Sequence, residues 1–196
     1  MIKQIRPSAN YTREKILKAA RSQFLRYGFN GSSIKLIAKE AQVNTNLIFH
    51  HFTNKETLWL QVKASILSEQ KIIPQYNLTS ATLYFKSILD YRFDLYERAP
   101  DLVRLIQWQQ LTEDEAVLIG NDINSPNNWL IYIENFQANS RIKPDIDPKQ
   151  IMLFIISSIY APFLQRVIPF SAQQKLDYKN MILDMCCSHF LTENIT

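Results

Sequence analysis

The segment from Ser33 to Lys55, SIKLIAKEAQVNTNLIFHHFTNK, constrains the fold more than any other part of this 196-residue chain. Two short stretches with apolar residues at helical spacing are separated by a tight turn at Ala41-Gln42 and are followed by an anchoring lysine. Two helices that cross closely need a small residue at their contact, and Ala38 meets that need. The segment therefore predicts a helix-turn-helix, whose second helix can lie in the major groove of DNA.

The rest of the sequence favours an all-α fold. Only three glycines occur, so tight β-turns and glycine loops that cradle phosphate are scarce. Apolar spacing, capping residues and helix-stopping prolines predict about nine helices. Their approximate ranges are 12–28, a short helix capped by Ser32 or Ser33, 44–52, 55–73, 79–98, 101–111, 129–141, 148–167 and 173–192.

Charge is unevenly distributed along the chain. Residues 1–63 hold eleven Lys and Arg against three acids, a net charge of +8, whereas the remainder holds eleven basic and fifteen acidic residues, a net charge of −4. A basic first third indicates that this end meets a polyanion and that the other end does not. Chance clustering of solvated lysines is the alternative.

The second helix of the predicted motif offers residues that can read bases. Asn44 can cap it and leave its first turn free to meet base edges. Thr45, Asn46 and Leu47 then project into the groove, where Asn pairs with adenine and Thr or Leu methyls pack on thymine methyls. His50, one turn after Asn46, shares that face.

Residues that flank this helix are suited to phosphate. Ser32 or Ser33, at a helix start, offers a hydroxyl and free backbone N–H groups to an anion. Lys35, in the same helix, is a further candidate DNA contact. His51 and Lys55 can clamp the DNA backbone on the other side, and such contacts set register without reading sequence.

Four motifs occur at consistent spacing between residues 12 and 60: R-x-x-I-L-x-A-A from Arg13, F-x-x-x-G-F from Phe24, I-A-x-x-A-x-V from Ile37, and F-H-H-F-x-x-K-E-x-L from Phe49. Together they resemble the TetR/AcrR family of bacterial transcriptional regulators. Beyond residue 60, only the helix count and the K-P-D-I-D-P helix break resemble the family.

The resemblance implies a homodimeric repressor that binds a palindromic operator in the cytoplasm and responds to a small-molecule effector. It implies a three-helix DNA-binding domain, placed at residues 1–54, and a helical effector-binding and dimerisation domain at 55–196. The base-reading role falls on Thr45 and its neighbours. The phosphate contacts fall on the start of the second helix and on Phe49, His51 and Lys55.

The sequence departs from the family pattern at three positions. In the turn, where the family commonly has glycine, this chain has Gln42. We expect Gln42 near left-handed geometry, at a cost of about 1–2 kcal/mol. Early in the reading helix, Asn46 replaces a glycine that is common in the family. We expect Asn46 to add a contact to a base or a phosphate. Phe49 replaces the tyrosine that is usual in the family. It can still make apolar contact, but it lacks the hydroxyl that would hydrogen-bond to phosphate. These departures leave the operator sequence open.

Residues 76–136 carry many aromatic side chains, as expected for the wall of a pocket that binds a largely apolar or aromatic ligand. Ordinary core packing is the alternative for each of them. The candidate ligand contacts are Tyr91, Trp108, Trp129 and Phe136 as walls, with Asp90, Arg104 or Gln107 as polar anchors.

Two apolar stripes near the C-terminus predict a four-helix dimer interface across a two-fold axis. An intramolecular core is the alternative reading for any single residue. The candidate dimer contacts are Phe154, Ile155 and Ser158 on one helix, and Tyr178, Met181, Ile182, Met185 and His189 on the next.

Other classes of protein find little support in the sequence. No nucleophile–base pair, metal-ligand spacing or cofactor motif is visible, so we expect no enzyme activity, metal or cofactor. Cys186 and Cys187 are adjacent and predict reduced thiols rather than a disulfide framework. Neither a signal peptide nor a membrane span is expected. A helical ligand-binding or scaffold protein with no operator function is the alternative, but it leaves the basic N-terminal third unexplained.

Overall fold

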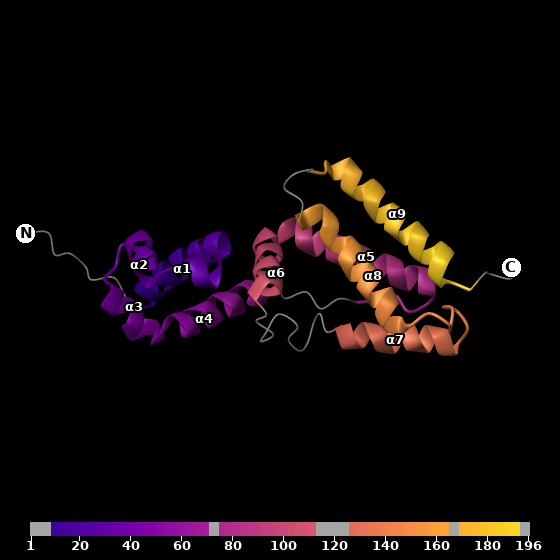
Figure 1. The fold of residues 1–196 in the computed structure, drawn as a ribbon, viewed down its shortest axis with the longest axis horizontal. Helices are drawn as coiled ribbons and strands as arrows, with labels where there is room; N and C mark the ends of the chain where they lie inside the picture. Colours follow the sequence, from indigo (N-terminus) through magenta and orange to yellow (C-terminus); the bar gives the residue numbers. More distant parts are fainter. Residues whose placement is uncertain (1–8, 71–74, 113–125, 165–168, 193–196) are drawn as a thin grey trace, which may run out of the picture. The chain divides into compact units, whose positions relative to one another are not determined.

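The computed structural model describes residues 9–70, 75–112, 126–164 and 169–192, and these ranges contain nine helices and no strand (Figure 1). The all-α prediction is confirmed. The last residues of the predicted helices 55–73 and 148–167 lie outside the described ranges. The helices are α1 (Ala9–Gly31), α2 (Ile34–Ala41), α3 (Thr45–Phe52), α4 (Lys55–Ser68), α5 (Ala81–Arg98), α6 (Pro100–Thr112), α7 (Pro126–Ala138), α8 (Pro148–Leu164) and α9 (Ala172–Phe190).

The chain divides into two compact units, residues 1–71 and 72–196. Helices α1 to α4 belong to the N-terminal unit, in which α4 packs against α1 and α3. The sequence predicts a boundary between the two functional domains after residue 54, before α4. The packing boundary lies after residue 71, so α4 packs with the N-terminal unit. The functional boundary stays a prediction.

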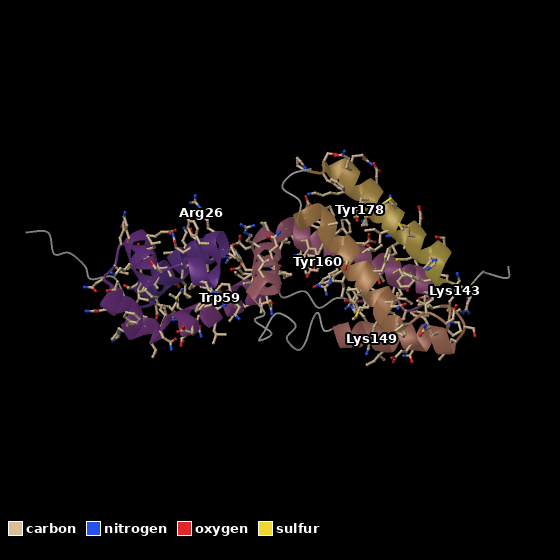
Figure 2. The ribbon with its side chains drawn as sticks, in the orientation of Figure 1. Arg26, Trp59, Lys143, Lys149, Tyr160 and Tyr178 are labelled. Carbon is tan, nitrogen blue, oxygen red and sulfur yellow. The ribbon has the colours of Figure 1, made fainter. Side chains whose placement is uncertain are left out.

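Apolar side chains from all four helices form the core of the N-terminal unit. The Phe24 ring of α1 is fully buried, and its centroid lies 5.0 Å from that of Trp59 on α4, which Figure 2 labels. Burying a large apolar side chain contributes about 1.5–3 kcal/mol, so this core fixes α2 and α3 against α1 and α4. Its other buried residues include Ile16 and Ala20, Ile37 and Ala38, Ile48 and Phe52, and Leu58 and Val62.

Helix α1 is interrupted at Gly28. This residue has φ 72° and ψ 177°, so its φ is positive and its ψ is extended, and the helix resumes as far as Gly31. A positive φ is easily adopted only by glycine, which has no Cβ. The hydroxyl of Ser32 donates a 2.7 Å hydrogen bond to the Gly28 carbonyl and stabilises the break.

Helix α5 is the central element of the C-terminal unit. It packs against α6, α8 and α9, while α7 packs against α8 (Figure 1). Its buried side chains include Tyr84, Phe85, Ile88, Leu89, Leu95 and Tyr96. Two ion pairs join α9 to α5, Lys179 to Asp90 at 2.6 Å and Lys175 to Glu97 at 2.8 Å.

Candidate functional site

The turn between α2 and α3 has the geometry that the sequence predicts. Gln42 lies in the left-handed region at φ 53° and ψ 49°, and its N–H donates to the Lys39 carbonyl at 3.2 Å. The next N–H, of Val43, donates to the Ala38 carbonyl at 3.0 Å. These bonds satisfy the last carbonyls of α2 and turn the chain sharply into α3.

Asn44 caps α3, as predicted. Its Oδ1 accepts a 2.8 Å hydrogen bond from the N–H of Asn46. Ile48 and Phe52 are buried on the inner face of the helix, at 0% and 1% exposure. The outer face is consequently free in the isolated chain, and its exposed residues are Asn46, Leu47, Phe49 and His50, with Thr45 half-buried beside them.

Ser33, rather than Ser32, caps α2. The Ser33 Oγ accepts a hydrogen bond from the N–H of Leu36 at 3.2 Å. Ser32 is buried, and its hydroxyl donates to the carbonyls of Gln23 and Gly28. The Ser32 hydroxyl is thus already used within the N-terminal unit, which favours Ser33 over Ser32 as the residue that meets phosphate.

The basic candidates lie on three helices of the N-terminal unit. Lys35 is exposed on α2, His51 is half-buried on α3, and the Lys55 Nζ lies 4.3 Å from the Phe29 ring centroid at the start of α4. Lys39, one turn after Lys35 and also exposed, was missed as a candidate DNA contact. Its spacing of four residues from Lys35 is a signal that would have found it.

Arg13 is a second residue that the site prediction missed. Its guanidinium carbon lies 5.2 Å from the centroid of the Phe52 ring, and its Nη2 donates to the Gln61 Oε1 at 2.9 Å. Arg13 on α1 thus touches both α3 and α4. In the sequence Arg13 is the first residue of a motif, but nothing in its local sequence identifies it as the residue that joins three helices.

In the C-terminal unit, two of the candidate ligand residues lie around a common neighbour. The rings of Tyr91 and Trp129 lie at 6.0 and 5.1 Å from the guanidinium carbon of Arg92. Trp129 is buried, and its Nε1 donates to the Tyr76 hydroxyl at 2.8 Å. Arg92 and Tyr76 were not among the candidates, although an arginine between Tyr91 and Phe93 within an apolar stripe is an unusual position for a charge.

The remaining ligand candidates lie in other surroundings. On α6, Arg104 donates to Gln107 at 3.0 Å, and its guanidinium carbon lies 5.6 Å from the ring centroid of Trp108. On α7, the Phe136 ring packs on that of buried Tyr84 at 5.4 Å. Asp90 is half-exposed; burial opposes its ionisation, but hydrogen bonds from Lys179 and Lys86 outweigh burial and lower its pKa. Its role as a ligand anchor stays a prediction.

The candidate dimer residues divide between the core and the surface. Ile155 and Ile182 are 1% exposed within the single chain, which favours the intramolecular alternative for them over contact with a second copy. Phe154 packs on Phe190 with ring centroids 5.5 Å apart. The candidates with exposed side chains are Met181, Met185 and His189, with Ser158 and Tyr178 half-buried.

Metal and thiol chemistry receive no support from the described ranges. They hold no group of three or more His, Cys, Asp and Glu side chains that is arranged to bind a metal ion. Cys186 is a free, buried thiol, and burial raises its pKa to about 12. None of the helices in these ranges has the length and apolarity needed to span a membrane.

Two family models match the chain, one on each unit. Residues 16–62 match bacterial regulatory proteins of the tetR family, and residues 90–180 match a tetracyclin repressor-like C-terminal domain. The first range contains the helix-turn-helix, from α2 to α3. The second contains Tyr91, Arg92 and Trp129, the whole of α8 and the first part of α9, as far as residue 180.

Individual relatives agree with these matches. The chain is 26% identical over 162 residues, 78% of its own length, to the HTH-type transcriptional repressor NicS of Pseudomonas putida, 76% of which is covered. It is 37% identical over 71 residues to the HTH-type transcriptional regulator UidR of Escherichia coli, a match covering 36% of the chain and 35% of UidR. A TetR transcriptional regulator from Chloroflexus aurantiacus has the same fold, with a TM-score of 0.66 and 17% identity over 94% of this chain and 98% of that one.

Proposed function

Because this chain belongs to the TetR family of DNA-binding transcription regulators, we propose that it is a repressor that a small ligand releases from its operator. We further propose that it acts as a homodimer on a palindromic site, in the cytoplasm, where a bacterial operator lies. Repression is the role of NicS, which this chain resembles over most of its length.

The observation that carries the proposal is the exposed outer face of α3. Its cap is formed by Asn44 and its inner face is buried by Ile48 and Phe52, so the helix is held rigidly while Asn46 and His50 stay exposed. A helix of eight residues supported in this way can enter the major groove without refolding. Asn46 can read adenine, whereas Phe49 offers only apolar contact.

Phosphate contacts are assigned to residues around this face. Ser33 lies at the start of α2, where free N–H groups and the helix dipole favour an anion. Lys35, His51 and Lys55 supply the other contacts, and Lys39 is added from its exposure on α2. Because the net charge of residues 1–63 is +8, counterion release should contribute strongly to affinity.

A dimer is proposed because one reading helix contacts too few bases for useful specificity. The methionines of α9, Met181 and Met185, are 48% and 46% exposed and are apolar candidates to meet a second copy. Ile182, on the same helix, is already buried within the single chain. Light scattering at micromolar concentration should report a dimer, and a clean monomer mass would contradict this part of the proposal.

Ligand release follows from linkage. A ligand that binds better to a conformation with mis-spaced reading helices must weaken DNA binding by the same free energy. The aromatic cluster of α5 and α7, which includes Tyr91 and Trp129, is our candidate for the ligand site. Helix α4, the last of the N-terminal unit, is the natural element to transmit the change.

A gel shift on the DNA around the chain's own gene tests the central claim. Specific DNA should be retained against excess random DNA, and affinity should fall steeply as salt is raised. If neither is observed, the regulator does not act at that DNA as proposed. Addition of ligand candidates to the preformed complex then tests release separately.

A further inference from the structure

Arg92 is a charged side chain in the interior of the C-terminal unit. It lies on α5, is 9% exposed, and its Nε has no hydrogen-bond partner within residues 9–70, 75–112, 126–164 and 169–192. Its Nη1 donates to the Tyr96 hydroxyl at 3.4 Å, which is a long hydrogen bond. A guanidinium has five N–H donors, so most of its capacity is unused among the residues that the structure describes.

Neighbouring carboxylates on α5 do not neutralise this charge. Asp90 pairs with Lys179 at 2.6 Å and also with Lys86. Asp94 pairs with Arg98 at 2.7 Å. Within the described ranges Arg92 is in no ion pair, although buried charges in proteins are normally paired.

Aromatic rings surround the guanidinium instead. Its central carbon lies 5.1 Å from the Trp129 ring and 6.0 Å from that of Tyr96. The Tyr96 ring stacks on Tyr160 of α8, which Figure 2 labels, with centroids 5.1 Å apart and planes 17° apart. Ring faces attract a cation but accept few of its N–H groups.

The phenols of this cluster cannot act as counter-anions. Burial raises the pKa of Tyr160 and of Tyr76, so both stay protonated at neutral pH. Each is a neutral group beside a positive charge. The cluster thus combines one unneutralised guanidinium with flat aromatic walls drawn from α5, α7 and α8.

We propose that Arg92 binds the anionic group of the effector, and that the effector is a planar aromatic monocarboxylate. A carboxylate matches the guanidinium fork with two parallel hydrogen bonds, and its single charge matches the single cation, whereas a phosphate dianion would need a second one. Flat rings such as Tyr96 and Trp129 suit an aromatic body. This inference rests on the proposed ligand response and narrows it from an apolar ligand to an acid.

The test compares acids with their neutral amides on the full-length protein without DNA. Benzoate and 2-naphthoate should raise the melting temperature, because a ligand that binds only the folded state stabilises it, whereas benzamide and 2-naphthamide should not. Calorimetric titration should show carboxylate affinity on the order of 10-fold to 100-fold above that of the matched amide. Equal effects of acids and amides, or no effect of either acid, would overturn the inference.

Variants separate a binding role from a structural one. Arg92→Met should abolish the response to acids, while Arg98→Met, on the same helix and exposed, should keep it. Without ligand, Arg92→Met should melt at or above the wild-type temperature, because a buried unneutralised charge opposes folding. A large fall in that temperature would identify a structural arginine and reject the binding role. If Arg92→Met does not fold, Arg92→Lys decides: it should bind the acids more weakly than wild type, and unchanged affinity would count against the inference.

DNA binding is measured separately, by anisotropy on the DNA around the gene. If the protein binds the acids but not the DNA, the proposed repressor function is contradicted and the Arg92 inference still holds. DNA binding with no response to acids would remove the Arg92 inference alone.

Discussion

The ammonium of Lys55 lies over the face of the Phe29 ring, with Nζ 4.3 Å from the ring centroid. The contact joins the first residue of α4 to the last turns of α1. At an exposed site it is worth about 0.5–1 kcal/mol. It also orders the lysine before any DNA is present, so less side-chain entropy is lost when a phosphate is bound.

We expect Lys55→Ala to weaken binding to operator and to random DNA by the same factor. Loss of one phosphate contact should also reduce the slope of log affinity against log salt by about 1. Fluorescence anisotropy over a salt series measures both quantities. Lys18→Ala, at an exposed lysine of α1 that we do not assign to DNA, is the matched control. A loss confined to operator DNA would show that Lys55 reads sequence.

Asn46→Ala should change base preference rather than general affinity. A lost pair of hydrogen bonds to adenine costs about 1–3 kcal/mol at one base pair and nothing elsewhere. Binding to a library of operators with single substitutions measures this change. Folded stability should not fall, because the cap of α3 uses the backbone N–H of Asn46 and not its side chain. A uniform loss across the library would reassign Asn46 to phosphate.

Two substitutions at Asn44 separate helix capping from DNA contact. Asn44→Ala removes the acceptor for the Asn46 N–H and should lower the free energy of unfolding by about 0.5–2 kcal/mol. Asn44→Asp keeps an acceptor at the helix start, so stability should be retained, but its negative charge should repel phosphate. Urea unfolding and anisotropy are the two measurements. Wild-type DNA affinity in Asn44→Asp would mean that the first turn of α3 does not face DNA.

Gln42→Gly should stabilise the protein. Left-handed geometry costs a residue with a Cβ about 1–2 kcal/mol, and the greater chain entropy of unfolded glycine offsets part of that cost. The expected gain is about 0.5–1 kcal/mol in the free energy of unfolding. Gln42→Val should destabilise, because a β-branched residue tolerates positive φ poorly. A loss of stability in Gln42→Gly would indicate that the glutamine side chain stabilises the turn.

Cys186 should resist alkylation and confer sensitivity to high pH. Burial raises the pKa of Cys186 from 9.0 to about 12, so its reactive thiolate is scarce near neutral pH. Cys187 has a half-exposed side chain and should therefore react faster with iodoacetamide than Cys186. Folding favours the neutral thiol, so the stability contribution of Cys186 is complete below pH 9.0 and is lost as the pH rises towards 12. Mass spectrometry of labelled peptides and urea midpoints, compared with Cys186→Ala, test both statements. Faster labelling at Cys186 would favour a thiol sensor.

Local features of the reading element could be predicted because neighbouring residues decide them. The cap at Asn44 and the left-handed Gln42 depend on residues within three positions along the chain. Local sequence could not decide whether Ser32 or Ser33 caps α2. The answer depends on the break in α1 at Gly28, because the Gly28 carbonyl accepts a hydrogen bond from the Ser32 hydroxyl.

Tertiary partners could not be predicted in the same way. An apolar stripe shows that a helix face is buried but not against what, so Ile155 and Ile182 could not be assigned to core or interface from spacing. The group around Arg92 brings together residues 76, 96 and 129, although the first and last of these are 53 positions apart in the sequence. No pattern within one helix encodes that proximity.

The short connection between α3 and α4 limits how far these helices can separate. Only Thr53 and Asn54 lie between them, and Asn54 is itself fixed as the cap of α4 through its bond to the Thr57 N–H at 2.7 Å. Three Cα steps span at most about 11 Å when fully extended. The connection therefore has almost no slack, and any larger displacement of the start of α4 must pull the reading helix with it or break the Asn54 cap.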